Sequence, residues 1–221
     1  MTIRGVIFDL DGTLLDSIDD IANSNNAMLQ KNGFPVHPVE RYVHWIGNGA
    51  GQLVRLSLPD EVASDEEKFK AYLDGYKKEY KQNLIVKSML YDGIPELLAF
   101  LNEKNIPMAV NTNKPHEQSV IIADHFLKPY CFRKIQGQMD NVPRKPDPAG
   151  AQIIARDCGL KTSEMVYIGD SIVDVTTSKA AGMQFIGVKW GYGSAGEMIN
   201  AGCEHVMDSP VELKTFIEKR I

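Results

Sequence analysis

The sequence predicts an α/β protein with an open parallel sheet and an inserted helical domain. Three observations support this prediction. From residue 92 to the C-terminus, short apolar runs typical of buried strands alternate with helical patterns. Residues 16–86 contain only helical patterns. The apolar run Ile3–Phe8 precedes this helical stretch and supplies an N-terminal strand for the sheet.

Composition narrows the classes of function. The chain has 221 residues, of which 43% are hydrophobic and 24% charged, as is typical of a globular protein. A net charge of −5 argues against nucleic acid and anionic membranes as partners. No apolar run approaches the roughly 18–20 residues that span a bilayer, and the N-terminus lacks a signal-peptide pattern. We therefore expect a cytoplasmic protein, in which Cys131, Cys158 and Cys203 are reduced thiols.

Helical patterns define the expected inserted domain. A first helix follows the candidate N-cap Asp16–Ser17. A second apolar set surrounds the glycine cluster Gly47–Gly51, and residues 64–82 form an amphipathic helix. Ser64 and Glu67 are spaced as a capping box at the start of that helix. The predicted boundaries are 16–86 for the helical domain and 1–15 with 87–221 for the α/β core.

The α/β core contains the remaining elements. The expected strands cover residues 3–8, 107–112, 132–135, 165–169, 184–188 and 204–207. The expected helices cover residues 93–104, a segment from 115, 147–158, 173–181, 194–201 and a segment from 209. Right-handed crossovers place the carboxyl ends of such parallel strands along one edge of the sheet, where ligands bind.

Polar residues interrupt the apolar pattern in four segments. Three of the segments follow predicted strands or begin helices: Asp9–Thr13, Asn111–Lys114 and Gly169–Asp174. The fourth, Lys145–Pro148, lies just before a predicted helix. If they meet at one sheet edge, they assemble carboxylates, a hydroxyl and an ammonium. Such a set suits a hard cation such as Mg²⁺ together with a phosphoryl group.

In content and order these four segments resemble the haloacid dehalogenase (HAD) superfamily of phosphatases. Within it the chain is most similar to phosphoglycolate phosphatases, which the segments Ile46–Ala50, Val110–Pro115 and Val188–Tyr192 also match. The resemblance implies a Rossmann-like catalytic core, with residues 16–86 as a helical cap domain.

The resemblance also implies catalytic roles. Asp9 matches the nucleophile that forms an aspartyl-phosphate, and Asp11 matches the general acid/base. Thr112 and Lys145 match the residues that bind the non-bridging phosphoryl oxygens. Lys145 is also expected to face Asp9 and keep it ionised.

The implied cofactor is Mg²⁺. Its expected ligands are the Asp9 carboxylate, the Asp11 backbone carbonyl and Asp170, and Asp174 orients the coordination shell directly or through water. Without the resemblance, Asp174 could instead be an exposed charge on a helix surface.

Further residues are assigned to substrate binding or to local structure. Asn113 joins Thr112 and Lys145 among the substrate-binding residues, although both Asn113 and Lys114 are expected chiefly to shape the turn before Pro115. His116 is expected to cap a helix start.

The glycine cluster allows two interpretations. It could be a simple connection between helices. Alternatively, the backbone N–H groups around Gly47 and Gly49 could bind a substrate carboxylate, assisted by Arg55.

The segment Gly191–Gly196 has the GxGxxG spacing of dinucleotide-binding proteins. Only 25 residues follow it, which is too few for a second nucleotide-binding half. No suitable acidic residue follows at the required distance either. We interpret it as a flexible loop beside the active-site edge.

The function predicted from these features is Mg²⁺-dependent hydrolysis of a small phosphomonoester, with phosphoglycolate as the first candidate. A β-phosphoglucomutase-like phosphomutase and a pyrophosphatase are alternatives on the same scaffold. A catalytically idle binding or regulatory module is the alternative outside enzymes. The expected partner is a small phosphorylated metabolite, with the protein a monomer or homodimer.

Overall fold

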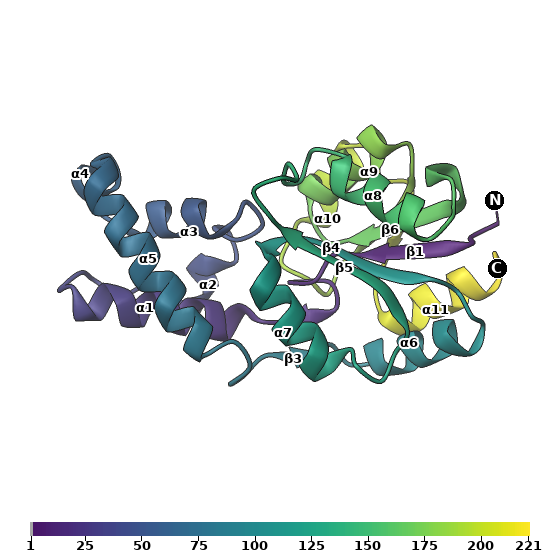
Figure 1. Ribbon diagram of the computed structural model, residues 1–221, viewed down its shortest axis with the longest axis horizontal. Coiled ribbons are helices and arrows are strands. Elements are labelled where there is room, and N and C mark those ends of the chain that lie inside the picture. The colour runs from purple at the N-terminus through teal and green to yellow at the C-terminus, as the bar shows by residue number, and fades with distance from the viewer. Residues whose placement is uncertain (1) are drawn as a thin grey trace. The chain divides into compact units, whose positions relative to one another are not determined.

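The chain folds into two compact units, of which the larger is α/β and the smaller helical (Figure 1). The computed structural model describes residues 2–221. The α/β unit runs to Asp16 and resumes from Leu90 to Ile221, and the helical unit comprises Ser17–Met89. None of the helices in residues 2–221 has the length and apolar character needed to cross a membrane.

The α/β unit contains a six-stranded parallel sheet in the order β5-β4-β1-β6-β7-β8. Its strands are β1 (Gly5–Phe8), β4 (Met108–Pro115), β5 (Phe132–Gln138), β6 (Met165–Gly169), β7 (Gln184–Val188) and β8 (Val206–Met207). A separate two-stranded sheet contains β2 (Leu15–Asp16) and β3 (Met89–Leu90). The predicted α/β class with an open parallel sheet is confirmed.

Helices cover the sheet as the alternating pattern predicts. They are α6 (Ile94–Glu103), α7 (His116–Phe126), α8 (Ala149–Asp157), α9 (Ile172–Ala181), α10 (Ala195–Asn200) and α11 (Pro210–Glu218), with a short 3₁₀ helix at Thr162–Glu164. Figure 1 shows α8, α9 and α10 on one side of the sheet and α6 and α11 on the other. Serine side chains cap several helix starts: Ser171 accepts from the Asp174 amide and Ser209 from the Glu212 amide.

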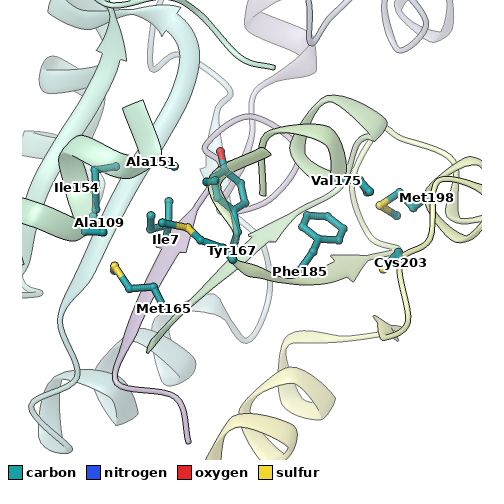
Figure 2. Packing of buried hydrophobic residues seen from close by; sticks show 13 residues of the cluster. Ile7, Ala109, Ala151, Ile154, Met165, Tyr167, Val175, Phe185, Met198 and Cys203 are labelled. Atoms are coloured by element: carbon teal, nitrogen blue, oxygen red, sulfur yellow. The ribbon is translucent and has the colours of Figure 1, made fainter. Parts of the chain in front are cut away.

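The register of the strands aligns their apolar side chains, which form a hydrophobic core on one face of the sheet (Figure 2). Ile7 pairs with Ala109 on one side and Tyr167 on the other, and Tyr167 pairs with Phe185. Because side chains two residues apart share a face, Met165 joins the same layer. Helices α8, α9 and α10 cover this layer with Ala151, Ile154, Val175 and Met198. These helices pack against one face of the sheet, and the packing holds the ends of its strands in place.

The helical unit contains α1 (Ile18–Lys31), α2 (Val39–Tyr42), α3 (Ala50–Ser57), α4 (Asp60–Ala63) and α5 (Glu66–Gln82). The predicted capping box of α5 is wrong. Asp65 is the N-cap, and its side chain accepts from the Lys68 amide at 3.1 Å. Ser64 instead donates to the Asp60 carbonyl at 2.8 Å because it ends the preceding helix α4.

A buried carboxylate ties together the two ends of the helical unit. Asp20, in the first turn of α1, is 2% exposed. It accepts hydrogen bonds from the backbone N–H groups of Val86, Lys87 and Ser88 at 2.8–3.0 Å. The Ser88 hydroxyl donates to it as well, at 2.7 Å. One side chain thus satisfies three successive amides of the segment that leaves the unit.

We expect Asp20→Ala to lower the free energy of unfolding by about 2–4 kcal/mol, because buried donors lose their acceptor. Urea denaturation measures the change. Asp19→Ala is the matched control: Asp19 neighbours Asp20 but is 48% exposed, and it lies 3.7 Å from Lys87. Such an exposed pair contributes about 1 kcal/mol or less. Equal effects of the two substitutions would contradict the role given to Asp20.

Candidate active site

Three neighbouring strands bring polar residues to one edge of the sheet. The register pairs Phe8 of β1 with Val110 of β4 and with Ile168 of β6. Asp9 directly follows Phe8, and Thr112 and Asp170 each lie two residues beyond its partners. The parallel pairing therefore places these residues at the carboxyl ends of adjacent strands, and all three are buried. This is the edge at which open α/β sheets bind ligands.

Lys145 links two of the carboxylates at this edge. Its Nζ lies 2.9 Å from Asp9 Oδ1 and 2.7 Å from Asp174 Oδ1, and its side chain is 4% exposed. Asp174 belongs to the first turn of α9, yet it is completely buried. Its second oxygen accepts from the hydroxyl of Ser171 at 2.6 Å. The alternative that Asp174 is an exposed helix charge is therefore wrong.

Asp170 is bound by the loop that follows β7. Its Oδ2 accepts from the backbone N–H groups of Tyr192 and Gly193 at 2.8 and 3.1 Å. Its Oδ1 accepts from the Thr13 hydroxyl at 3.1 Å. The GxGxxG segment thus directs its amides at a carboxylate of the protein itself. This agrees with its exclusion as a nucleotide site, but the loop has a defined binding role that the sequence did not indicate.

Burial and mutual repulsion shift the acidities of this group. Burial raises the pKa of Asp9 to about 8; Lys145 opposes the shift, while Asp174 and Asp170 add to it. Burial likewise raises the pKa of Asp170 to about 6, reinforced by Asp174 and opposed by the Tyr192 and Gly193 amides. Burial disfavours the charged Lys145, yet Asp174 and Asp9 together raise its pKa well above the usual value. Lys145 therefore stays charged, and Asp9 and Asp170 need further positive charge nearby to be fully ionised.

The residues at this edge fit a divalent cation. Asp9, Asp170 and Asp174 each offer a carboxylate oxygen, and these oxygens lie within 4.8 Å of one another. When ionised, three carboxylates against the single Lys145 ammonium leave a net charge of −2 in this group. Buried charges of this kind require compensation, and oxygen donors suit Mg²⁺. The Asp11 side chain is outside this group, and its predicted metal contact concerned its backbone carbonyl.

The sequence did not reveal a second ion pair at the site. Lys114 Nζ lies 2.7 and 2.9 Å from the two carboxylate oxygens of Asp11. The Lys114 side chain is 3% exposed, and that of Asp11 is 19% exposed. Lys114 was assigned to the turn before Pro115, but β4 continues to Pro115 and places Lys114 two residues beyond Thr112. The two-residue spacing of Thr112 and Lys114 on one strand is the signal that could have assigned Lys114 to the site together with Thr112.

Two neighbouring residues have supporting contacts. The Asn113 side-chain amide donates to the Lys145 carbonyl at 3.1 Å and so supports the loop that carries the ammonium. The predicted capping by His116 is wrong, because the N-cap of α7 is Pro115. His116 Nδ1 instead accepts from the Gly137 amide at 3.4 Å, which joins the start of α7 to β5.

The remaining predicted substrate-binding residues lie in the helical unit. Gly47 and Gly49 precede α3, with Gly49 as its N-cap. The Arg55 guanidinium lies 3.8 Å from the Phe69 ring centroid and pairs with Glu66 at 3.0 Å. It also donates to the Ala63 carbonyl. The charge of Arg55 is thus engaged by neighbours within its own unit.

Comparisons with known proteins identify relatives over most of the chain. The family model described as haloacid dehalogenase-like hydrolase matches residues 6–188. The chain is 34% identical over 197 residues to a phosphoglycolate phosphatase of Pseudomonas putida, covering 86% of this chain and 70% of that one. A phosphoglycolate phosphatase of Photobacterium profundum is 35% identical over 208 residues, with 90% and 88% covered.

Solved structures agree with these relatives. A predicted phosphoglycolate phosphatase from Haemophilus somnus superposes with a TM-score of 0.89 at 27% identity, covering 98% of each chain. A predicted phosphatase from Clostridium acetobutylicum gives a TM-score of 0.85 at 28% identity, covering 99% of this chain and all of that one.

Proposed function

Because the chain belongs to the haloacid dehalogenase-like hydrolase family, we propose that it is a Mg²⁺-dependent phosphatase of small phosphomonoesters, with phosphoglycolate the first candidate. The observation that carries the proposal is the buried Lys145 ammonium shared by Asp9 and Asp174 beside Asp170. This cluster combines a candidate nucleophile, a cation for phosphoryl oxygens and carboxylates for a metal. The relatives named phosphoglycolate phosphatase support the choice of substrate.

The first half-reaction forms an aspartyl-phosphate. A carboxylate oxygen of Asp9 attacks phosphorus as the bond from phosphorus to the leaving oxygen breaks. Asp11 gives its proton to that oxygen, so that the product leaves as a neutral alcohol group. Lys145 and Thr112 donate hydrogen bonds to the non-bridging oxygens, where charge accumulates in the transition state.

The second half-reaction regenerates the enzyme. Asp11, now a carboxylate, takes a proton from water, whose oxygen attacks phosphorus and releases Asp9. Asp9, Asp170 and Asp174 would bind Mg²⁺ through their side chains, with the Asp11 carbonyl as a further ligand. When bound, Mg²⁺ would supply positive charge that favours the ionised form of Asp9 and screens the phosphoryl group from the carboxylates. Residues 16–86 are proposed as the cap that selects the leaving group.

Phosphate release tests this proposal. The protein should release phosphate from p-nitrophenyl phosphate and from phosphoglycolate when Mg²⁺ is present, and chelation by EDTA should stop both reactions. Release that is unaffected by EDTA would contradict the metal requirement. A folded protein that releases no phosphate from either ester would contradict the proposed activity.

Mg²⁺ affinity should depend on pH because protons compete for the same carboxylates. The raised pKa of Asp9, about 8, means that binding displaces a proton at neutral pH, and Asp170 adds a second near pH 6. The affinity should fall by up to about tenfold per pH unit for each displaced proton as pH decreases. Calorimetry in buffers of different ionisation enthalpy measures both the affinity and the proton release. A Mg²⁺ affinity that does not change between pH 8 and 5.5 would contradict the prediction that protons compete with Mg²⁺ for Asp9 and Asp170.

A further inference from the structure

Lys114 is the second buried ammonium at this edge of the sheet, and the half-reactions above assign it no role. It contacts both oxygens of Asp11 at 2.7 and 2.9 Å. Lys145 is placed differently, between Asp9 and Asp174. The two lysines thus divide the site: one faces the nucleophile and the metal carboxylates, and the other faces the general acid/base.

The pair constrains how Asp11 can act. Asp11 must carry a proton to act as the general acid, and the neutral carboxyl no longer offers its negative charge to Lys114. Asp11 must therefore give up its ion pair with Lys114 before it protonates the leaving oxygen. That change is unfavourable because Lys114, whose side chain is only 3% exposed, gives up an ion pair.

A carboxylate on the substrate removes this difficulty. Lys114 lies two residues beyond Thr112 on β4, and the Lys114 amide donates to the Thr112 hydroxyl at 3.2 Å. The backbone of Lys114 is therefore bonded to the residue proposed to bind phosphoryl oxygens, and its ammonium contacts the residue proposed to protonate the leaving oxygen. An anionic group close to the ester oxygen of a compact substrate would reach it.

We propose that Lys114 is a specificity-determining residue that exchanges the Asp11 carboxylate for a carboxylate carried by the leaving group. This inference rests on the proposed function and refines it to phosphate esters of short hydroxy acids. Exchange replaces the ion pair that Lys114 gives up and frees Asp11 to act on the leaving oxygen. A neutral leaving group offers no replacement anion, so its ester binds the phosphoryl site but leaves Asp11 on Lys114.

Two esters that differ in this charge test the inference. Phosphoglycolate carries the carboxylate, and 2-hydroxyethyl phosphate replaces it with a neutral hydroxymethyl group of similar size. The wild-type protein should prefer phosphoglycolate in kcat/KM, with part of the preference in kcat because the exchange frees the general acid. Lys114→Met should reduce the preference ratio by about ten- to hundredfold, as expected for the loss of a charge-assisted pair.

Two further variants complete the comparison. Lys114→Arg keeps the charge and should retain part of the preference, and it replaces the Met variant if that protein does not fold. Lys128→Met removes an exposed lysine of the same unit and should leave the ratio unchanged.

The outcomes separate this inference from the proposed function. Equal kcat/KM values for the two esters in the wild-type protein would overturn the inference without any variant. A preference that Lys114→Met leaves intact would also overturn it, although Mg²⁺-dependent hydrolysis would stand. A folded wild-type protein that releases no phosphate from either p-nitrophenyl phosphate or phosphoglycolate would overturn the proposed function itself.

Discussion

Asp9→Asn is expected to abolish Mg²⁺-dependent phosphate release, lowering kcat by about 10⁴-fold or more. The amide has nearly the same size as the carboxylate but cannot attack phosphorus. Asp9 is 8% exposed and follows β1 directly, so the substitution alters the reacting atom at an otherwise unchanged position. Phosphate release from p-nitrophenyl phosphate, with Mg²⁺ in excess, measures the loss.

Asp9→Asn should not lower the stability of the folded protein, although it abolishes activity. Burial and repulsion from Asp174 and Asp170 raise the pKa of Asp9 to about 8, so its charged form is unfavourable in the folded protein. Between its usual pKa near 3.8 and about 8, the folded state holds a proton that the unfolded state releases, and stability therefore falls as pH rises. Asn removes this penalty, and Lys145 keeps Asp174 as its partner. In EDTA at pH 8, the melting temperature of the variant should equal or exceed that of the wild type.

Asp140→Asn is the matched control for Asp9→Asn. Asp140 is exposed and belongs to the same α/β unit. Its substitution should leave kcat and stability near wild-type values. Retention of more than about one percent of activity by Asp9→Asn would refute its role as nucleophile, since nucleophile variants of hydrolases lose far more.

Two strands made of apolar runs were predictable from the sequence to the residue, whereas β1 begins at Gly5 and not at the predicted Ile3. The predicted 165–169 and 184–188 are the bounds of β6 and β7, because continuous apolar runs with clear ends mark strands buried on both faces. Two other strands, β4 and β5, were predicted too short. β4 continues through Asn113 and Lys114 to Pro115, and β5 continues through polar residues to Gln138. Polar side chains at the strand ends hid the extension, and at the end of β4 they include Lys114, which pairs with Asp11 in the site.

Contacts within the site were predictable from the sequence only where the chemistry of one residue requires a partner of a particular type. The contact between Lys145 and Asp9 was expected, since a buried nucleophilic carboxylate needs a cation, and the structure places them 2.9 Å apart. Lys114 and Asp11 are separated by 103 positions, and no local pattern relates them. The contact of the Tyr192 and Gly193 amides with Asp170 was not predictable either, because nearly every residue type has a backbone N–H group.

The contact of the Tyr192 and Gly193 amides with Asp170 leads to the second prediction, which concerns Mg²⁺ binding. Gly193→Ala should weaken Mg²⁺ binding by about ten- to hundredfold, as expected when groups that orient a metal ligand are displaced. A Cβ on Gly193 would overlap the carbonyl oxygen of Asp170 and come within 2.8 Å of its carbonyl carbon. Backbone atoms cannot rotate away, so the loop must move. The movement would separate the Tyr192 and Gly193 amides from Asp170 Oδ2.

The same movement should change the acidity of Asp170. The two amides oppose the rise in its pKa to about 6. Their loss should raise that pKa further, since they favour the charged carboxylate. Mg²⁺ must then displace a more tightly bound proton, so the defect in affinity should be larger at pH 6 than at pH 8. Activity at pH 8 should recover in part when Mg²⁺ is raised, which separates a weakened metal site from a misfolded protein.

Gly196→Ala tests whether the effect of Gly193→Ala belongs to the contact or to the loss of a glycine in this segment. The nearest atom to a Cβ on Gly196 would be Ser194 Oγ at 3.7 Å, an ordinary contact. Gly196 lies in α10, where alanine is the better helix former. This variant should bind Mg²⁺ as the wild type does, with equal or slightly higher stability. If calorimetry gave the same Mg²⁺ affinity for both variants, the Tyr192 and Gly193 amides would have no part in positioning Asp170.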